Sequence, residues 1–456
     1  MGRAEDVLTA AAAAESRSLW AKIGLRSPEQ RAWALYDWAN SAFQCTIIAA
    51  VFPVYYSSVA AADLPGATAT ARFAATTTIA LTIIALLSPV LGAYADFAGA
   101  RKRLLALGMV LGVPATAGMF WIERGDYRLA EVLFLLGNIG IYASFVFYDS
   151  LLPHVASEKE MDRVSSAGYA VGYLGGGLLL VLNLLWILRP HWFGLPDAGL
   201  ASRLSFLSVA VWWVAFAIPL FRRIPEPPVH PEAMALAARG AVRASAAQLI
   251  GTLRELRAYK QAALMLIAFL IYNDGIGTII RMGVVYGTEL GLPSSALIGA
   301  IVMVQFVGVP FALLFGRLAA RTGAKPAIFL ALVIYTIISV IGYRMTTAWE
   351  FFVLAFLVGT VQGGSQALSR SLFATMVPRH KSSEFFGFFA VFEKFAGIFG
   401  PAIFALSVHL TGSSRQAILS VIGFFVIGGA LLARVDVDAG RRAARAAEAV
   451  VRGERP

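Results

Sequence analysis

The sequence predicts an all-α integral membrane protein with twelve transmembrane helices in two pseudo-symmetric bundles of six. Three observations support this fold class. The 456 residues are 58% hydrophobic and only 14% charged, twelve apolar runs reach membrane-spanning length, and the two halves of the chain resemble each other. Soluble domains average about 25% charged residues, so this chain is not built to face water on all sides.

The twelve expected spans follow one another through most of the chain, because a helix needs about 20 mostly apolar residues to cross the hydrocarbon core. They cover residues 34–59, 72–93, 103–123, 129–150, 165–188, 202–221, 262–286, 295–316, 326–345, 349–370, 384–409 and 416–434. The seventh and eleventh spans are the least regular, since they carry internal charges.

The positions of the basic residues orient these spans, because cytoplasmic loops carry an excess of Lys and Arg. With the N-terminus inside, 29 of the 38 Lys and Arg residues fall in cytoplasmic segments, seven fall outside and two lie within spans. We therefore expect a multi-pass protein of the plasma membrane with both termini cytoplasmic.

A hydrophilic stretch at 222–260 divides the spans six and six. It opens with "RRIPEPPVHPE", whose proline density predicts an extended chain. It closes with "AQLIGTLRELRAYK" (247–260), which has the spacing of a surface helix lying along the membrane. The expected organisation is a cytoplasmic N-terminal segment (1–32), a first bundle (33–221), this linker (222–260), a second bundle (261–434) and a basic cytoplasmic tail (435–456).

Short matches at equivalent positions relate the two halves. "GAYADFAGARKR" after span two corresponds to "GRLAARTGAK" after span eight, with the same offsets of four, seven and nine. "AVGYLGGG" (170–177) in span five corresponds to "AVFEKFAG" (390–397) in span eleven. Internal six-span repeats are typical of two-bundle transporters that hold their substrate between the halves near mid-membrane.

The loop after span two resembles the signature loop of the major facilitator superfamily. It has the pattern Gly-x-x-x-Asp-x-x-Gly-x-Arg-Lys, made of Gly92, Asp96, Gly99, Arg101 and Lys102. Phe97 stands where the superfamily usually has a basic residue, and Ala320 replaces the aspartate in the second copy. The resemblance implies the major facilitator fold.

Longer segments resemble the vacuole-effluxer-like branch of that superfamily. They are "WALYDWANSAF" (33–43), "GYLGGGLLL" (172–180), "YNDGIGTIIRMGVVYGTELGL" (272–292), "GGSQALSRSLFATMVP" (363–378) and "EFFGFFAVFEKFAGIFGP" (384–401). The branch is named after a yeast autophagy-related protein implied in releasing amino acids from the vacuole. The resemblance covers most of the chain and implies efflux, with amino acids as the first expected cargo.

Polar residues inside the spans are the candidates for substrate or proton binding. An ionisable residue at mid-membrane costs about 2.5–3.5 kcal/mol on insertion scales, so each needs a partner or a water-filled cavity. The candidates are Asp37, Asn40, Gln44, Asn273, Asp274, Arg281, Gln362, Gln366, Glu393 and Lys394.

Asp37 begins a polar stripe in span one that Ser41 and Gln44 continue. It is expected about one turn into the membrane, and two interpretations are open. Asp37 is either an interfacial acid near Arg31 that helps to fix the topology, or a cavity-lining acid that binds a cation, a proton or a substrate amine. In the second case we expect it to act as a gate or entry residue.

Asp274 in span seven is the strongest single candidate for a deeper site. Arg281 lies on the same face two turns away, too far to pair with it directly. Gly275 and Gly277 are expected to loosen the helix between them, as in the broken helices of transporters. The alternative role for Asp274 is a structural ion pair with Lys394.

Spans ten and eleven supply the remaining candidates. Gln362 and Gln366 share one stripe of span ten with Ser369, and this stripe either contacts substrate or bonds helix to helix. Glu393 and Lys394 are adjacent in span eleven, so they diverge by about 100° and cannot serve one point.

A second group of residues, at the ends of spans, is expected to form an inner gate. It consists of Gly92, Asp96, Gly99, Arg101, Lys102, Asp149 and Arg370. The resemblance to the superfamily implies that Asp149 pairs with Arg101 or Arg103, in a latch that breaks when the two bundles rock.

Several function classes are disfavoured by what the sequence lacks. It has no Walker loop, so ATP does not drive it directly. It has no His-Glu-x-x-His run, and its one cysteine, Cys45, leaves no cysteine cluster, so we expect no enzyme activity, metal or cofactor. The basic residues lie between apolar runs rather than in a compact domain, which argues against a nucleic-acid partner.

The sequence therefore predicts a secondary transporter that works as a monomer in the lipid bilayer and moves a small polar or zwitterionic metabolite by alternating access. Asp37 and Asp274 are the expected acids for a proton or an ammonium group, and Arg281 and Lys394 are the expected cations for a carboxylate. Proton coupling is left open. Two alternatives remain: efflux of amphipathic compounds or lysolipids, and a membrane receptor that keeps the fold but moves nothing.

Overall fold

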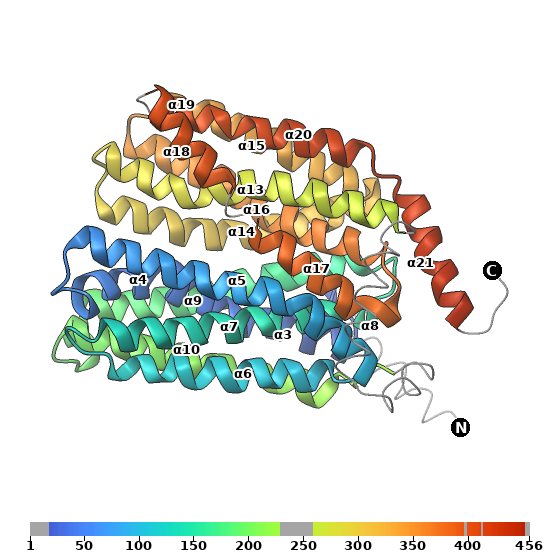
Figure 1. The fold of residues 1–456 in the computed structure, drawn as a ribbon, viewed down its shortest axis with the longest axis horizontal. Coiled ribbons are helices and arrows are strands. Elements are labelled where there is room, and N and C mark those ends of the chain that lie inside the picture. Colours follow the sequence, from blue (N-terminus) through green and yellow to red (C-terminus); the bar gives the residue numbers. More distant parts are fainter. Residues whose placement is uncertain (1–17, 229–258, 396–398, 412–413, 452–456) are drawn as a thin grey trace.

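Over the residues that the computed structural model describes (18–228, 259–395, 399–411 and 414–451), the chain consists of helices and their connecting turns. Figure 1 shows long helices running side by side, with those of residues 18–224 grouped in one half of the molecule and those of 259–433 in the other. The short helix α8 and the last helix, α21, lie at one end of the bundle. We call this the terminal end and the opposite one the far end.

The N-terminal half begins with α2 (Leu19–Ile23) and contains six membrane-spanning segments. They are α3 (Pro28–Ala42), which continues through a π-helical stretch (Phe43–Ala50) and α4 (Val51–Tyr55) to Ala60, then α5 (Gly66–Ala98), α6 (Arg101–Gly118), α7 (Tyr127–Ser150) with the short α8 (Leu152–Val155) after it, α9 (Met161–Leu188) and α10 (Ala198–Arg223).

The C-terminal half repeats this plan. It contains α13 (Lys260–Glu289), α14 (Ser294–Thr322), α15 (Ala324–Arg344), α16 (Ala348–Ala374), α17 (Ser382–Phe395), α18 (Phe399–Thr411), α19 (Ser414–Ser420) and α20 (Ile422–Ala433), and α21 (Val437–Val451) follows it.

Within the described residues, 11 helices are long and apolar enough to cross a membrane, and they coincide with eleven of the expected spans. The remaining span, expected at 384–409, contains α17 up to Phe395 and α18 from Phe399, and residues 396–398 lie outside the described part. The prediction of an all-α membrane protein with the twelve-helix arrangement is confirmed.

Several element bounds differ from the expected domain bounds. A capping box of Ser27 and Gln30 starts α3 at Pro28, so the first span begins inside the segment 1–32. The surface helix expected at 247–260 falls almost entirely outside the described residues. The tail expected at 435–456 forms α21 over most of its length.

The seventh span is a continuous helix, so the expected loosening at Gly275 and Gly277 is wrong. Gly275 serves close packing instead. A Cβ atom there would lie 2.9 Å from the Cβ of Phe424 and 2.8 Å from Cε1 of Phe425, both on α20. A missing side chain on α13 thus makes room for two aromatic rings.

A glycine ends each of the two helices that precede the repeated loops. Gly99 closes α5 with φ 58°, and Gly323 closes α14 with φ 90°. Only glycine adopts this left-handed region without strain, which makes it the usual residue just after a helix. The sequence repeat after spans two and eight is therefore a repeated helix stop.

A row of glycines on α9 lets this helix approach α3 closely. Gly168, Gly172 and Gly176 are spaced four apart, so they lie on one face. A Cβ on Gly172 would lie 2.7 Å from the Ser41 hydroxyl and 3.3 Å from the Cβ of Asp37. This contact holds the middle of α3 against α9, and Asp37 lies on that part of α3.

We expect Gly176→Ala to lower the free energy of unfolding by about 1–3 kcal/mol, the usual cost of an overpacked core. The added Cβ would lie 2.8 Å from the Ser41 carbonyl oxygen and 2.9 Å from the Cys45 sulfur, so the backbone of α3 has to move. Gly423→Ala on α20 is the matched control, because nothing lies within 4 Å of its Cβ position. Thermal unfolding in detergent micelles measures both variants, and equal melting temperatures would contradict the packing role.

Candidate functional site

Arg370, close to the terminal end of α16, reaches out of the C-terminal half into the N-terminal half. Its Nη1 lies 2.9 Å from Oδ1 of Asp149, and its Nη2 lies 3.5 Å from Oδ2 of Asp37. Its Nε donates to the Ser165 hydroxyl (3.0 Å) and its Nη2 to the Ser165 carbonyl (3.1 Å). The three charged side chains are only 3–11% exposed, so they form a buried cluster between the halves.

Aromatic rings enclose the guanidinium of Arg370. Its Cζ lies 4.7 Å from the ring centre of Trp33, 5.7 Å from that of Tyr148 and 4.5 Å from that of Tyr169. The Tyr148 hydroxyl donates to Oδ2 of Asp37 (2.7 Å), and the Trp33 indole donates to the Tyr148 carbonyl (3.0 Å). Cation–π contacts and hydrogen bonds thus compensate in part for the water that these charges have lost.

Asp37 lies within the helix bundle. Because α3 begins at Pro28, Asp37 lies about two and a half turns after the start of this helix. Its carboxylate is bound by Arg370 and Tyr148, while Arg31 donates to two backbone carbonyls of the preceding loop. The structure buries Asp37 between the helices and pairs it with Arg370, which favours the interpretation as a buried acid over that as an interfacial one.

The cluster contains two carboxyl groups and one guanidinium, so its net charge depends on whether one of the carboxyl groups holds a proton. Taking an ion out of water costs several kcal/mol even after the protein relaxes, and only close partners repay it. Arg370 has two such partners in this arrangement, Asp37 and Asp149.

The expected partner of Asp149 is wrong. Asp149 pairs with Arg370, and Arg101 pairs with Asp96 at 2.6 Å. Arg103 is exposed. The physical reason is the direction of α7: its second-to-last residue faces the interior of the bundle, where a guanidinium from the other half is within reach.

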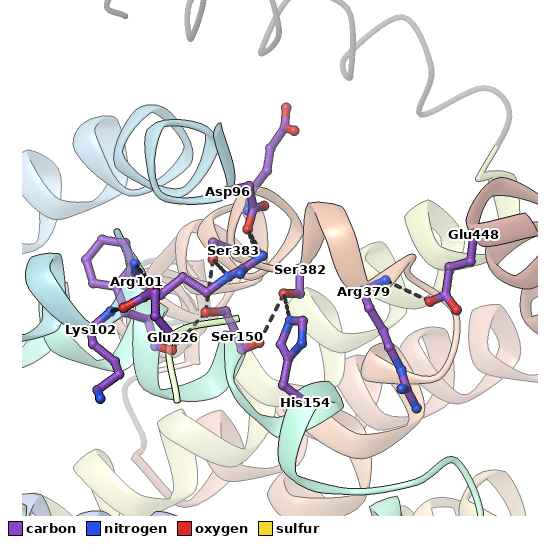
Figure 2. Close-up of polar contacts among 12 residues, drawn as sticks. Asp96, Arg101, Lys102, Ser150, His154, Glu226, Arg379, Ser382, Ser383 and Glu448 are labelled. Carbon is purple, nitrogen blue, oxygen red and sulfur yellow. Dashed lines mark hydrogen bonds and ion pairs between the residues drawn. The ribbon is translucent and has the colours of Figure 1, made fainter. Parts of the chain in front are cut away.

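Asp96 and Arg101 form a second polar contact between the halves, at the terminal end (Figure 2). The carboxylate of Asp96 accepts from the backbone N–H groups of Ser383 (3.1 Å) and Glu384 (2.8 Å), at the beginning of α17. Arg101 also donates to the Ser383 hydroxyl (2.8 Å). An acid at a helix N-terminus satisfies free N–H groups and the helix dipole. A Cβ on Gly92 would run into the backbone of Ser383, so Gly92 allows this close approach.

Lys102 has a structural position within the N-terminal half. Its ammonium donates to the carbonyls of Phe221 (2.9 Å) and Ile224 (2.6 Å). Glu226 accepts the backbone N–H groups of Arg101 (2.7 Å) and Lys102 (3.0 Å). These bonds fix the start of α6 against the end of α10.

Further hydrogen bonds join the two halves, and all of them lie at the terminal end of the described helices. They link Ser382 to the Ser150 carbonyl (3.0 Å) and to Nε2 of His154 (3.3 Å), Ser383 to the Ser150 hydroxyl (3.1 Å), Ser165 to the Ala367 carbonyl (2.8 Å), and Ser371 to Asp162 (2.6 Å). The halves are therefore held together at this end.

The expected amide residues lie on both halves. Asn40 is buried one turn after Asp37, while Gln44, in the π-helical stretch, is half-buried. Gln366 and Gln362 on α16 are half-buried as well, and they lie one and two turns from Arg370. π-helical turns are rare and occur frequently at functional sites.

The structure keeps Asp274 apart from the Arg370 cluster. Asp274 and Asn273 are buried in α13, and a Cβ on Gly400 of α18 would lie 3.0 Å from Oδ1 of Asp274. The Thr278 hydroxyl donates to the Asp274 carbonyl (2.7 Å). Asp274 thus lies at the contact of α13 with α18, within the C-terminal half. Arg281, further along α13, is exposed.

Glu393 is half-buried on α17 and lies within electrostatic reach of Asp149 and Tyr169. The structure therefore brings Glu393 toward the Arg370 cluster. The side chain of Lys394 lies outside the described residues, so neither its ion pair with Asp274 nor a role in the site is tested.

Sequence reasoning missed the neutral members of the cluster. They are Trp33, Tyr148, Ser165 and Tyr169. Residue type gives little signal for them, because aromatic residues and serines are common in spans. Tyr148 adjoins Asp149, and an aromatic residue beside a buried acid was the available clue.

We expect Arg370→Ala to lower the free energy of unfolding by about 3–5 kcal/mol, because it leaves two carboxylates buried without their cation. Adding Asp149→Asn to this variant should recover part of the loss. Arg344→Ala is the matched control, since Arg344 is exposed at the end of α15. Unfolding in detergent micelles provides the measurement. Equal stability of the two single variants would show that the ion pairs do not hold the halves together.

Comparison with known proteins relates both the sequence and the fold to one group of transporters. A family model described as "Vacuole effluxer Atg22 like" matches residues 26–445. The chain is 39% identical over 409 residues to an MFS-type transporter of Bacillus subtilis (strain 168) named YxiO, covering 89% of this chain and 94% of the relative. It is 25% identical over 418 residues to autophagy-related protein 22-1 of Phaeosphaeria nodorum, covering 77% of this chain and 74% of that one.

Solved structures show the same fold at low sequence identity. The proton:xylose symporter XylE, bound to 6-bromo-6-deoxy-D-glucose, matches with a TM-score of 0.66 and 14% identity over 88% of this chain and 94% of its own. A bacterial homologue of the iron transporter ferroportin, in an outward-facing state, matches with a TM-score of 0.63 and 14% identity over 90% and 99%. The chain belongs to the vacuole effluxer Atg22-like family of the major facilitator superfamily, whose members are transporters and not enzymes.

Proposed function

We propose that this transporter exports a small polar or zwitterionic metabolite, with amino acids as the first candidates, by alternating access of its two halves. The observation that supports the proposal is the buried cluster in which Arg370 of one half binds Asp37 and Asp149 of the other. A cluster of this kind ties the conformation of the protein to the occupation of its charged groups.

Opening of the terminal end would separate Arg370 from the two carboxylates. Charges that part inside a membrane protein need replacement partners, because leaving one of them buried alone costs several kcal/mol. A proton or a substrate ammonium group would satisfy Asp37 or Asp149, and a substrate carboxylate would satisfy Arg370. A zwitterion supplies both partners at once, which favours an amino acid over a sugar or a simple cation.

The remaining polar residues have supporting roles in this proposal. Three amide side chains would form hydrogen bonds with the polar groups of the cargo, since a neutral amide can both donate and accept hydrogen bonds. They are Gln44, Gln362 and Gln366. Asp274 stays a candidate proton site, separate from the cargo. The protein would work as a monomer in the plasma membrane with both termini cytoplasmic, as the excess of Lys and Arg on that side indicates.

Transport into proteoliposomes tests the cargo. We expect flux of at least one member of a mixed amino-acid panel, and a change of that flux with an imposed pH gradient if protons are coupled. Efflux of lysolipid or of amphipathic dyes, with no flux of any amino acid, would replace the leading cargo by the amphipathic one.

We expect Asp37→Asn to lower the transport rate about tenfold or more, because it removes one of the two carboxylates that pair with Arg370 when the terminal end is closed. Asp63→Asn is the control at an exposed acid, which pairs with Arg124 at the far end. Both variants are reconstituted at equal density and compared for initial rate. An unchanged rate in Asp37→Asn would remove the cluster from the mechanism.

The variant Asp274→Asn distinguishes the role of Asp274 from that of Asp37. If Asp274 carries the proton, this variant keeps exchange of labelled cargo across the membrane but loses its acceleration by a pH gradient. Loss of exchange as well would instead assign Asp274 to cargo binding or to the structure of the C-terminal half, and no effect on either readout would exclude it from the site.

A further inference from the structure

The last helix, α21, crosses the terminal end after the C-terminal half is complete (Figure 1). It begins only four residues after α20 ends at Ala433. The ammonium of Lys325, at the start of α15, donates to the carbonyls of Ala433 and Val435, both at 2.8 Å. These bonds fix the direction in which the chain leaves the last span.

The first part of α21 is seated on the C-terminal half. Gly440 lies against α16's end, where a Cβ would be 2.7 Å from the sulfur of Met376 and 3.2 Å from the Cβ of Gln261. The Gln261 side chain accepts the backbone N–H of Asp436 (2.8 Å). Further along, Glu448 accepts the backbone N–H of Arg379 (2.8 Å), as Figure 2 shows.

The arginine face of the same helix reaches the N-terminal half. Both contacts are made to Glu158, in the loop between α8 and α9. Nε of Arg441 lies 3.3 Å from its Oε1, and Nη2 of Arg445 lies 2.5 Å from its Oε2. Glu158 therefore forms ion pairs with two arginines of α21, so this helix contacts both halves.

The contact continues toward the buried cluster. Arg441 is within electrostatic reach of Asp162, in the first turn of α9. Asp162 accepts from the Ser371 hydroxyl at 2.6 Å, and Ser371 directly follows Arg370 on α16. The acids that face α21 thus lie in the loop before α9 and in the first turn of α9, next to the part of α9 that meets the site.

We propose that α21 is a clasp that stabilises the conformation in which the terminal end is closed. The inference rests on the proposed alternating access of the halves. The bonds of α21 to Gln261 and Arg379 connect it to the half of the chain that it follows. Its ion pairs with Glu158 connect the two halves. Only the latter must break when the terminal end opens, so they lower the free energy of the closed state alone.

The expected effect of the clasp is moderate. Exposed ion pairs contribute little each, but a carboxylate held by two arginines forms a small network. We expect loss of the Glu158 contacts to raise the ratio of open to closed molecules about threefold to tenfold.

Electron–electron distance measurements on spin-labelled protein test the clasp without reference to any cargo. The single cysteine is removed as Cys45→Ala, and labels are placed at Arg103→Cys on α6 and Arg321→Cys on α14, two exposed positions on opposite halves. The protein is studied as the full chain in phosphatidylcholine nanodiscs, so that no anionic lipid competes for the arginines of α21.

We expect Glu158→Gln, and separately Arg441→Gln with Arg445→Gln, to increase the population at long distance to the same extent. Combining all three changes should add nothing further, since both sets remove one interaction. Glu158→Arg together with Arg441→Glu and Arg445→Glu should restore the original distribution. Glu29→Gln, in the first turn of α3 at the same end, is the control and should change nothing.

Two outcomes separate failure of the clasp from failure of the proposed function. If there are two distance populations and their ratio is the same in the wild type and in the Glu158, Arg441 and Arg445 variants, the clasp is overturned and alternating access is left intact. A single distance population in the wild type and in every variant, with and without the cargo identified by transport, would overturn both.

Discussion

The guanidinium of Arg370 is buried at the boundary of two helix bundles, with its charge compensated by Asp37 and Asp149 from the bundle to which it does not belong. A cation in this position is tolerated only if its partners are held within about 3–4 Å, because each ion has lost its water. Three rings and the serine at the start of α9 complete the enclosure. The rest of the terminal end is arranged so that the two bundles can approach closely enough to keep these partners in place.

Small residues make that approach geometrically feasible. Gly168, Gly172 and Gly176 bring α9 against α3, which sets the depth of Asp37. Gly92 allows α5 to meet the beginning of α17, where Asp96 receives two backbone N–H groups. Close backbone contact and charge compensation therefore occur at the same end of the molecule, and the helix α21 lies across it. This arrangement accounts for a closed terminal end.

Much of the architecture could be predicted from the sequence, because the length of an apolar run and the distribution of charge are local properties. The membrane-spanning helices follow from them. The site was predicted only in part. Asp37 is a candidate because an acid inside a span is costly, whereas Asp149 and Arg370 are expected in a separate gate at the ends of spans, with Asp149 paired to Arg101 or Arg103. The neutral residues around Arg370 carry no such cost, and their residue types give little signal because aromatic residues and serines are common in spans.

What the sequence determined by itself is that a dozen apolar helices cross a membrane and that a few ionisable groups are left inside, each in need of a partner. Only the tertiary structure decided which groups are partners. The pairing of Asp37 with Arg370 joins residues 333 positions apart, and no local pattern encodes it. It arises because helix packing brings α3, α7, α9 and α16 together at one depth. The same packing put Asp274 against α18 instead, inside its own bundle.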